Sequence, residues 1–207
     1  MCFSATASFS AALVLALIGL LALRAVKQRA YYALALVPLL FAVQQAAEGM
    51  VWLTNGAQPG WVYLYLFFVL MVWPAWVPLS VWMIETDKKR SYALLGCCVA
   101  GLLAVAAYGF ELLRSGATAT VGDHISYYFT IPMHVPVFFG LAGYLLLVTG
   151  SCCISSKRLI NFFGVLAFAA ALLTIMVWKI WFTSVWCFFG AVISCSVYGI
   201  VRFYNKK

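Results

Sequence analysis

Residues 9–26 read FSAALVLALIGLLALRAV, an apolar run whose single charge, Arg24, comes near its end. About 20 apolar residues in a helix cross the hydrocarbon core of a bilayer. No positively charged segment precedes this run, so it lacks the pattern of a cleavable signal peptide. We therefore expect residues 9–26 to remain in the mature protein as its first transmembrane helix.

The rest of the chain has the same character. Of its 207 residues, 66% are hydrophobic and 9% are charged, whereas soluble domains are roughly 45–50% apolar and 25% charged. A soluble fold of this size has too little interior for so much apolar surface. The sequence predicts an all-α membrane protein, one domain over residues 1–207 with about seven transmembrane helices in a lipid bilayer. The expected helices are Phe9–Val26, Tyr31–Thr54, Trp61–Ile84, Tyr92–Phe110, Ile125–Val148, Leu159–Trp178 and Ser184–Val201.

The basic residues predict how this bundle is oriented. Alternate connections, counted with the C-terminal end, hold eleven Lys and Arg residues, and the other set holds only Arg114 and Lys179. Cytoplasmic loops are enriched in Lys and Arg, so we expect the N-terminus outside and the C-terminus in the cytoplasm. These clusters also explain the net charge of +8. No basic face interleaved with stacking aromatic residues is visible, and nucleic acid is not an expected partner.

Only Lys179 interrupts the apolar sequence between Leu159 and Val201. A single helix of that length would be roughly 60 Å long, about twice the thickness of the hydrocarbon core. We therefore expect two helices joined by a tight turn near Lys179.

Glu48 is the acidic residue that lies well inside an apolar segment. A carboxyl group in hydrocarbon costs at least ~2.5 kcal/mol unless it is neutralised or paired, so such residues suggest function. Gln44 lies one helical turn from Glu48, and Gln45 lies three residues away. The three side chains predict a polar stripe that faces the bundle interior. It is either a structural hydrogen-bond cluster or a site for a substrate, an ion or a proton.

Two histidines are candidate partners of Glu48. His134 is expected at nearly the same depth in the fifth helix, where a Glu–His pair would hold or relay a proton. His124 follows Asp123 at the expected start of that helix, where Asp123 fits the role of an N-cap. An alternative reading makes Glu48, His124 and His134 a two-histidine, one-carboxylate zinc site. Otherwise no cofactor is predicted.

Several motifs extend beyond these residues. The chain starts with MCFSATASF (1–9), contains QQAAEG (44–49) followed by Trp52, and has SVWCFFGA at 184–191. A further pair joins Ser155-Ser156 to Phe163-Gly164. In these motifs the chain resembles a family of uncharacterised bacterial multi-pass membrane proteins. The resemblance implies a seven-helix fold in the bacterial inner membrane, and it implies no established activity.

Under the expected topology, three of these motifs and His134 fall in the outer half of the membrane. This predicts an outward-facing polar pocket built on Glu48, with Trp186 and Cys187 at its rim. Cys2 near the start of the chain has three readings: a terminal metal ligand or nucleophile once Met1 is removed, a disulfide partner of Cys187, or a side chain that only packs. The residues proposed to belong to the pocket are Glu48, Gln44, Gln45, His134, Trp52, Trp186, Cys187 and Cys2.

Three functions are compatible with such a pocket. The first is binding or translocation of a small molecule, ion or proton, with Glu48 as counter-charge or proton carrier. The second is a metal-dependent intramembrane hydrolase that acts on a lipid or an amide. The third is a structural or assembly role without a ligand. The sequence does not identify a substrate, an oligomeric state or a catalytic activity.

Overall fold

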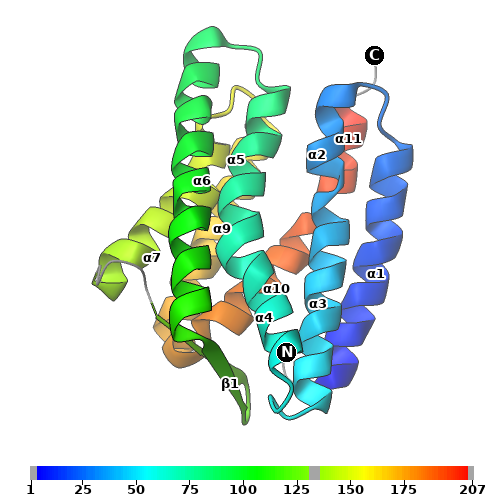
Figure 1. The fold of residues 1–207 in the computed structure, drawn as a ribbon. Coiled ribbons are helices and arrows are strands. Elements are labelled where there is room, and N and C mark those ends of the chain that lie inside the picture. Colours follow the sequence, from blue (N-terminus) through cyan, green and yellow to red (C-terminus); the bar gives the residue numbers. More distant parts are fainter. Residues whose placement is uncertain (1–3, 131–135, 205–207) are drawn as a thin grey trace.

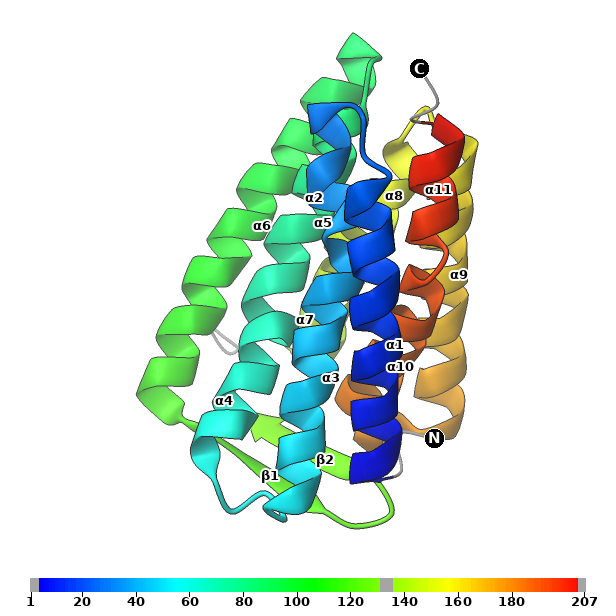
Figure 2. The ribbon, with the colours of Figure 1, turned by 90° about the vertical axis from the view of Figure 1, so that its right-hand side faces the viewer.

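The structure, a computed structural model, describes residues 4–130 and 136–204. Its helices run up and down along one elongated bundle (Figures 1 and 2). Six helical segments of the described residues are long and apolar enough to cross a membrane, by length and composition, and a shorter apolar helix covers Phe138–Ile154. The fold is therefore all-α in its main part, as predicted. The six segments are Ala5–Arg24, Arg29–Leu53, Pro59–Ile84, Lys88–Ser115, Arg158–Val177 and Lys179–Tyr204.

Several of these segments are composed of shorter elements in succession. The described elements, in chain order, are α1 (Ala5–Arg24), the 3-10 turn η1 (Arg29–Tyr31), α2 (Tyr32–Ala35), α3 (Val37–Leu53), α4 (Pro59–Phe67), the π-helical turn η2 (Phe68–Val72), α5 (Trp73–Ile84), α6 (Lys88–Ser115), β1 (Ala117–Val121), β2 (Ile125–Phe129), α7 (Val137–Leu145), the π-helical turn η4 (Leu146–Gly150), α8 (Ser151–Ile154), α9 (Arg158–Val177), the 3-10 turn η5 (Lys179–Trp181), α10 (Phe182–Ser194) and α11 (Val197–Tyr204).

The bundle has two chemically different ends. The hairpin end carries the β1–β2 hairpin, the start of α1 and the η5 turn, and the basic end carries the α1–α2, α5–α6 and α8–α9 connections (Figures 1 and 2). Of the Lys and Arg residues that the structure describes, Arg114 and Lys179 lie at the hairpin end. The described basic residues at the basic end are Arg24, Lys27, Arg29, Lys88, Lys89, Arg90, Lys157, Arg158 and Arg202.

The β hairpin is the main departure from the expected fold. Residues 125–129 form β2, which pairs antiparallel with β1 from Ala117↔Phe129 to Val121↔Ile125. The predicted helix Ile125–Val148 is therefore wrong over its first five residues. Alternating β-branched and aromatic side chains favour strands here, and the Gly122–His124 turn closes the hairpin. Asp123 lies in this turn and is not the N-cap of a helix.

The turn expected near Lys179 is confirmed, because α9 ends at Val177 and η5 begins at Lys179. Other segments are interrupted where the sequence analysis expected continuous helix. The second segment breaks at Leu36, just before Pro38, and the last one breaks between Ser194 and Val197. The fourth helix is longer than expected at both ends.

The π-helical turn η2 follows from Pro74. The N–H group of Trp73 donates to the Phe68 carbonyl, five residues back, and Pro74 has no N–H group to offer. The Val69 carbonyl is thus left without a partner inside its own helix. The Tyr144 hydroxyl, from the end of α7, donates to it at 2.7 Å. A buried aromatic side chain thereby satisfies a backbone group that proline released.

Helices α5 and α6 pack closely at a backbone carbonyl that a second proline leaves free. Pro78 cannot donate to the Pro74 carbonyl four residues earlier, and Gly101 of α6 packs directly against that oxygen. A Cβ atom at Gly101 would overlap the Pro74 oxygen. The absence of a side chain at Gly101 therefore allows α5 and α6 to pack closely.

Glu85 joins two helical connections at the basic end. Its carboxylate accepts hydrogen bonds from the Ser155 hydroxyl (3.1 Å) and from the Ser156 hydroxyl and N–H (both 2.6 Å). The N–H groups of Thr86 and Asp87 also donate to it, at 2.8 and 2.9 Å. Burial opposes ionisation, but these hydrogen bonds outweigh it and lower the pKa of Glu85 to about 2. The Ser155-Ser156 motif thus ties the α8–α9 connection to the α5–α6 turn.

Candidate functional site

The polar stripe predicted on the second segment is a buried cluster on α3. Gln44, Gln45 and Glu48 each have 0% of their surface exposed. Residues three and four apart lie on one helical face, and the Gln45 amide donates to the Glu48 carboxylate at 3.1 Å. From α10, the Ser184 hydroxyl donates to the other Glu48 oxygen at 2.5 Å. Glu48 therefore links α3 to α10 in the interior of the bundle.

Glu48 has no cationic partner among the described residues. The ion pair found in residues 4–130 and 136–204 is Arg114–Glu111, at 3.5 Å and at the hairpin end. Both hydrogen bonds given above for Glu48 come from neutral groups. A buried carboxylate without a cation is costly. Its charge is balanced either by a proton or by a cation from outside the described residues.

Aromatic side chains enclose this cluster. The Trp73 indole donates to the Gln44 amide oxygen at 2.7 Å and stacks on Phe41, with ring centroids 3.9 Å apart. The Tyr65 hydroxyl donates to the Thr183 carbonyl at 3.1 Å, and its side chain also interacts with Glu48 and Cys187. The ring of Tyr65 stacks on that of Tyr127 in β2, 4.4 Å away. The hairpin thus packs on the wall of the cluster.

The cluster retains hydrogen-bonding capacity. Gln44 Nε2, Gln45 Oε1 and Trp52 Nε1 are buried and have no hydrogen-bond partner among the described residues. Buried polar atoms in proteins are nearly always satisfied by protein or by ordered water. Two donors and an acceptor close to Glu48 therefore suit a polar ligand, water or an exchanging proton.

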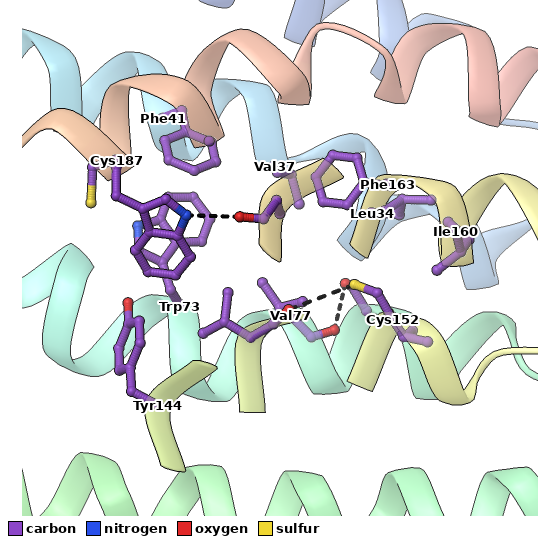
Figure 3. A pocket seen from close by; sticks show the side chains of 16 residues that line it. Leu34, Val37, Phe41, Trp73, Val77, Tyr144, Cys152, Ile160, Phe163 and Cys187 are labelled. Atoms are coloured by element: carbon purple, nitrogen blue, oxygen red, sulfur yellow. Dashed lines mark hydrogen bonds between the residues drawn. The ribbon is translucent and has the colours of Figure 1, made fainter. Parts of the chain in front are cut away.

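Two cavities lie beside this cluster. The inner cavity, of about 50 Å³, runs from Tyr144 and Cys187 toward Cys152 and Ile160 in the half of the bundle nearer the basic end (Figure 3). Its wall is mostly apolar and includes Trp73, which binds Gln44. The outer cavity, of about 430 Å³, is bounded by β2, α7 and the α9–α10 turn at the hairpin end. Pockets of 300–1,000 Å³ are typical of small-molecule sites.

Three residues, Tyr144, Trp186 and Cys187, line both cavities. Tyr144 is fixed by its hydrogen bond to the Val69 carbonyl, and Trp186 by one of 3.0 Å from its indole to the Ala167 carbonyl. The Tyr144 and Trp186 rings meet edge to face, 5.7 Å apart. These residues form the partition between the cavities, and Cys187 in that partition interacts with Gln44 and Tyr65 of the Glu48 cluster.

The structure brings together part of the predicted site. Gln44, Gln45 and Glu48 form one cluster, and Trp186 and Cys187 lie beside it. Trp52 lies one helical turn from Glu48, and its indole nitrogen is buried. The residues Cys2 and His134 lie outside the described part of the chain.

The predicted zinc ligands are not assembled in the part of the chain that the structure describes. Residues 4–130 and 136–204 contain no group of three or more His, Cys, Asp or Glu side chains close enough to hold a metal ion. His124 lies in the hairpin turn, where its ring packs on Trp181 with centroids 4.7 Å apart. Cys187 is a free, buried thiol.

Four residues of the site were missed as site residues: Ser184, Tyr65, Trp73 and Tyr144. Ser184 begins the SVWCFFGA motif, so its position in the sequence offered a signal. The three aromatic residues lie in apolar helices rich in Trp, Tyr and Phe, where no local pattern separates a hydrogen-bonding ring from one that only packs.

Comparison with known proteins gives a family and no activity. No curated protein and no solved structure matches this chain. One family model covers residues 1–207, and its description is "Family of unknown function (DUF6629)". The chain therefore belongs, over its whole length, to the DUF6629 family.

Proposed function

We propose that this protein is a multi-pass membrane protein of the bacterial inner membrane, with the hairpin end outside and the basic end in the cytoplasm. Six apolar helical segments of sufficient length support insertion. The distribution of basic residues supports the orientation, with nine described at the basic end and two at the hairpin end.

Reporter fusions test this orientation. A green fluorescent protein fused after Lys207 folds in the cytoplasm and should fluoresce, whereas alkaline phosphatase at the same point should be inactive. Alkaline phosphatase inserted in the Gly122–His124 turn should be active because that turn faces the periplasm. The opposite pattern of activities would reverse the topology.

The second part of the proposal is that the protein binds and translocates a small molecule, with Glu48 carrying a proton or balancing a charge. The observation that carries it is the buried Glu48 carboxylate, which has no cationic partner among the described residues and adjoins Cys187 in the partition between two cavities. A buried carboxylate without a fixed cation responds to protonation or ligand binding.

The arrangement of the cavities supports a path through the bundle. The outer cavity opens at the hairpin end, and the inner one reaches Ile160, two residues after α9 begins at the basic end. Between them stands the partition of Tyr144, Trp186 and Cys187. A hydrogen bond holds Tyr144 on the Val69 carbonyl, and in this proposal Tyr144 leaves that carbonyl when a molecule passes. The two π-helical turns, η2 and η4, flank this contact and supply the irregular backbone typical of functional helices.

A proton-flux assay tests this function. Purified protein in liposomes that contain a pH-sensitive dye is exposed to a panel of small organic anions, cations and neutral compounds. Glu48→Gln keeps the size of the side chain and one acceptor oxygen and removes its titration, so it should abolish ligand-dependent proton flux. Glu111→Gln, at a second buried acidic residue, is the matched control and should retain it. Equal flux in Glu48→Gln and wild type would refute the role of Glu48.

A structural role is the second candidate, favoured by one observation. The Ser184–Glu48 hydrogen bond joins α3 to α10 in the interior, which stabilises the bundle without any ligand. In that case Glu48→Ala lowers thermal stability and no compound changes proton flux.

A further inference from the structure

The outer cavity has an uneven lining that specifies its ligand more closely. Sixteen described residues line it, and seven of them are aromatic. Tyr108 and Phe129 lie on different walls, and Trp186 lies on the partition to the inner cavity. Most of this surface therefore offers apolar and aromatic contact to a ligand body, with little to satisfy a charged group.

One charged residue, Lys179, is present among the described lining residues. It is exposed in the η5 turn at the hairpin end, so its ammonium group lies where the cavity meets solvent. Tyr128, whose side chain is 53% exposed, and Thr183 add hydroxyl groups to the same lining. A positive group with hydroxyl donors suits the oxygens of a carboxylate or another small anion.

The sign of the charge selects between two kinds of amphiphile. Aromatic walls alone would also suit an organic cation. No acidic side chain is among the described lining residues, and Glu48 lies behind Ser184 and Cys187, outside that lining. A cation would therefore meet Lys179 at the entrance and find no carboxylate on the wall.

We propose that the outer cavity binds an amphiphilic anion, with its negative head group on Lys179 and its apolar body between the aromatic walls as far as Trp186. This inference rests on the proposed small-molecule function and names its ligand class. The source of such an anion is either a free aliphatic or aromatic acid or the head group of an anionic membrane lipid. Both share the same chemistry at Lys179.

Direct binding of radiolabelled octanoate tests the assignment. The protein is placed in phosphatidylcholine nanodiscs and binding is measured by scintillation proximity, with empty nanodiscs as the blank. Unlabelled octanoate should displace the label, and octylamine and octanol should compete at least about fivefold more weakly. Lys179→Gln should weaken octanoate binding by about fivefold, the effect of an exposed ion pair, and Lys179→Arg should restore it.

Two variants separate this site from general membrane partitioning. Leu141→Trp places a large ring in the outer cavity and should remove octanoate binding. Arg114→Gln removes the other basic group of the hairpin end, which pairs with Glu111, and should leave binding unchanged. Repeating the assay in phosphatidylglycerol nanodiscs identifies the source. Lys179-dependent binding that weakens there assigns the site to a lipid head group, and binding that persists assigns it to a free anion.

The failures are distinguishable. If octylamine and octanol compete as well as octanoate, and Lys179→Gln has no effect, the anion assignment is wrong while Leu141→Trp still reports binding in the cavity. If wild type binds no more than empty nanodiscs, the ligand class is wrong, and the Glu48 flux assay remains the independent test of function. If Leu141→Trp binds octanoate as wild type does, the cavity is not the site.

Discussion

The two ends of the bundle differ in how their acidic side chains are buried and hydrogen-bonded. At the basic end, Glu85 is a partly exposed carboxylate with five hydrogen bonds from the connections around it. In the half nearer the hairpin end, Glu48 is fully buried and adjoins groups with unused hydrogen-bonding capacity. At the basic end, hydrogen bonds to Glu85 hold the helix connections together. The hairpin end encloses a cavity of about 430 Å³.

This contrast separates stabilising polar groups from those available for function. A carboxylate at the surface with several donors gains hydrogen bonds at little desolvation cost. A buried carboxylate loses its hydration and regains it only in part. We therefore expect a buried carboxylate such as Glu48 to have a role besides stabilising the fold. Substitutions at Glu48 and at Glu85 test this difference.

The largest effect is expected at Glu48. Glu48→Ala leaves the Gln45 amide and the Ser184 hydroxyl without their buried acceptor, so the free energy of unfolding should fall by about 2–4 kcal/mol. Glu48→Gln keeps an acceptor and should cost less than half of that. Thermal unfolding in detergent measures both. A Glu48→Ala protein as stable as wild type would mean that Glu48 does not link α3 to α10.

Two glycines compare a close contact between helices with an exposed helix surface. A Cβ atom at Gly164 in α9 would lie 2.6 Å from Cys152 Cβ and 2.8 Å from the Thr149 carbonyl oxygen, whereas one at Gly143 in α7 meets nothing within 4 Å. Gly164→Ala should therefore lower the free energy of unfolding by about 2 kcal/mol through overpacking. Gly143→Ala should be neutral or slightly stabilising because alanine favours helix. Equal effects on unfolding would refute the difference in packing.

The hydrogen bonds of Glu85 make a smaller, pH-dependent contribution. Because its folded-state pKa of about 2 lies below the ordinary value of 4.5, the carboxylate stabilises the fold above about pH 4.5, and this stabilisation is lost as the pH falls through 2. Glu85→Gln should lower the free energy of unfolding by about 1 kcal/mol at pH 7. The difference from wild type should shrink below pH 4. A gap that stays constant from pH 7 to pH 3 would contradict this linkage.

A stability effect as small as that of Glu85→Gln is expected in the partition between the cavities. Tyr144→Phe keeps the ring and removes the hydroxyl that satisfies the Val69 carbonyl, so the cost in unfolding free energy should be about 1 kcal/mol. Under the proposed function, the same change should raise ligand-dependent proton flux because the partition loses a hydrogen bond. Flux below that of wild type would indicate that the hydroxyl contacts the ligand and does not close the path.

The sequence predicted the helical segments that have long apolar runs and charged separators. Residues 9–26 and the turn at Lys179 are examples, because burial in hydrocarbon demands length and a break in apolarity. The hairpin was missed because Ile125–Phe129 is a short apolar run next to the longer run of α7, and short runs do not distinguish strand from helix. The π-helical turns depend on tertiary partners such as Tyr144, which local sequence does not reveal.

The candidate site was predictable where polarity itself gave the signal. Gln44, Gln45 and Glu48 differ from everything around them, and an intramembrane carboxylate implies a partner. Their aromatic neighbours, Tyr65 and Trp73, come from a helix whose other aromatic residues have no such role. Which rings meet the cluster depends on how α4 and α5 rotate against α3, and the rotation is set by tertiary packing.

Because of the π-helical turn η2, the number of residues in this helix determines which of its side chains face Glu48. A π turn contains one residue more than an α-helix needs, and each residue rotates a helix by about 100°. Deleting Met71 would turn the Trp73–Phe68 hydrogen bond into the ordinary α-helical one, so Tyr65 would keep facing Glu48 and α5 would keep its place against α6. A one-residue deletion between Tyr65 and the turn would instead rotate Tyr65 by about 100° away from Glu48. The effect of gaining or losing a single residue in this helix therefore depends on its position: relatives that lack one residue within the turn should keep the side chains that face Glu48, and relatives that lack one between Tyr65 and the turn should not.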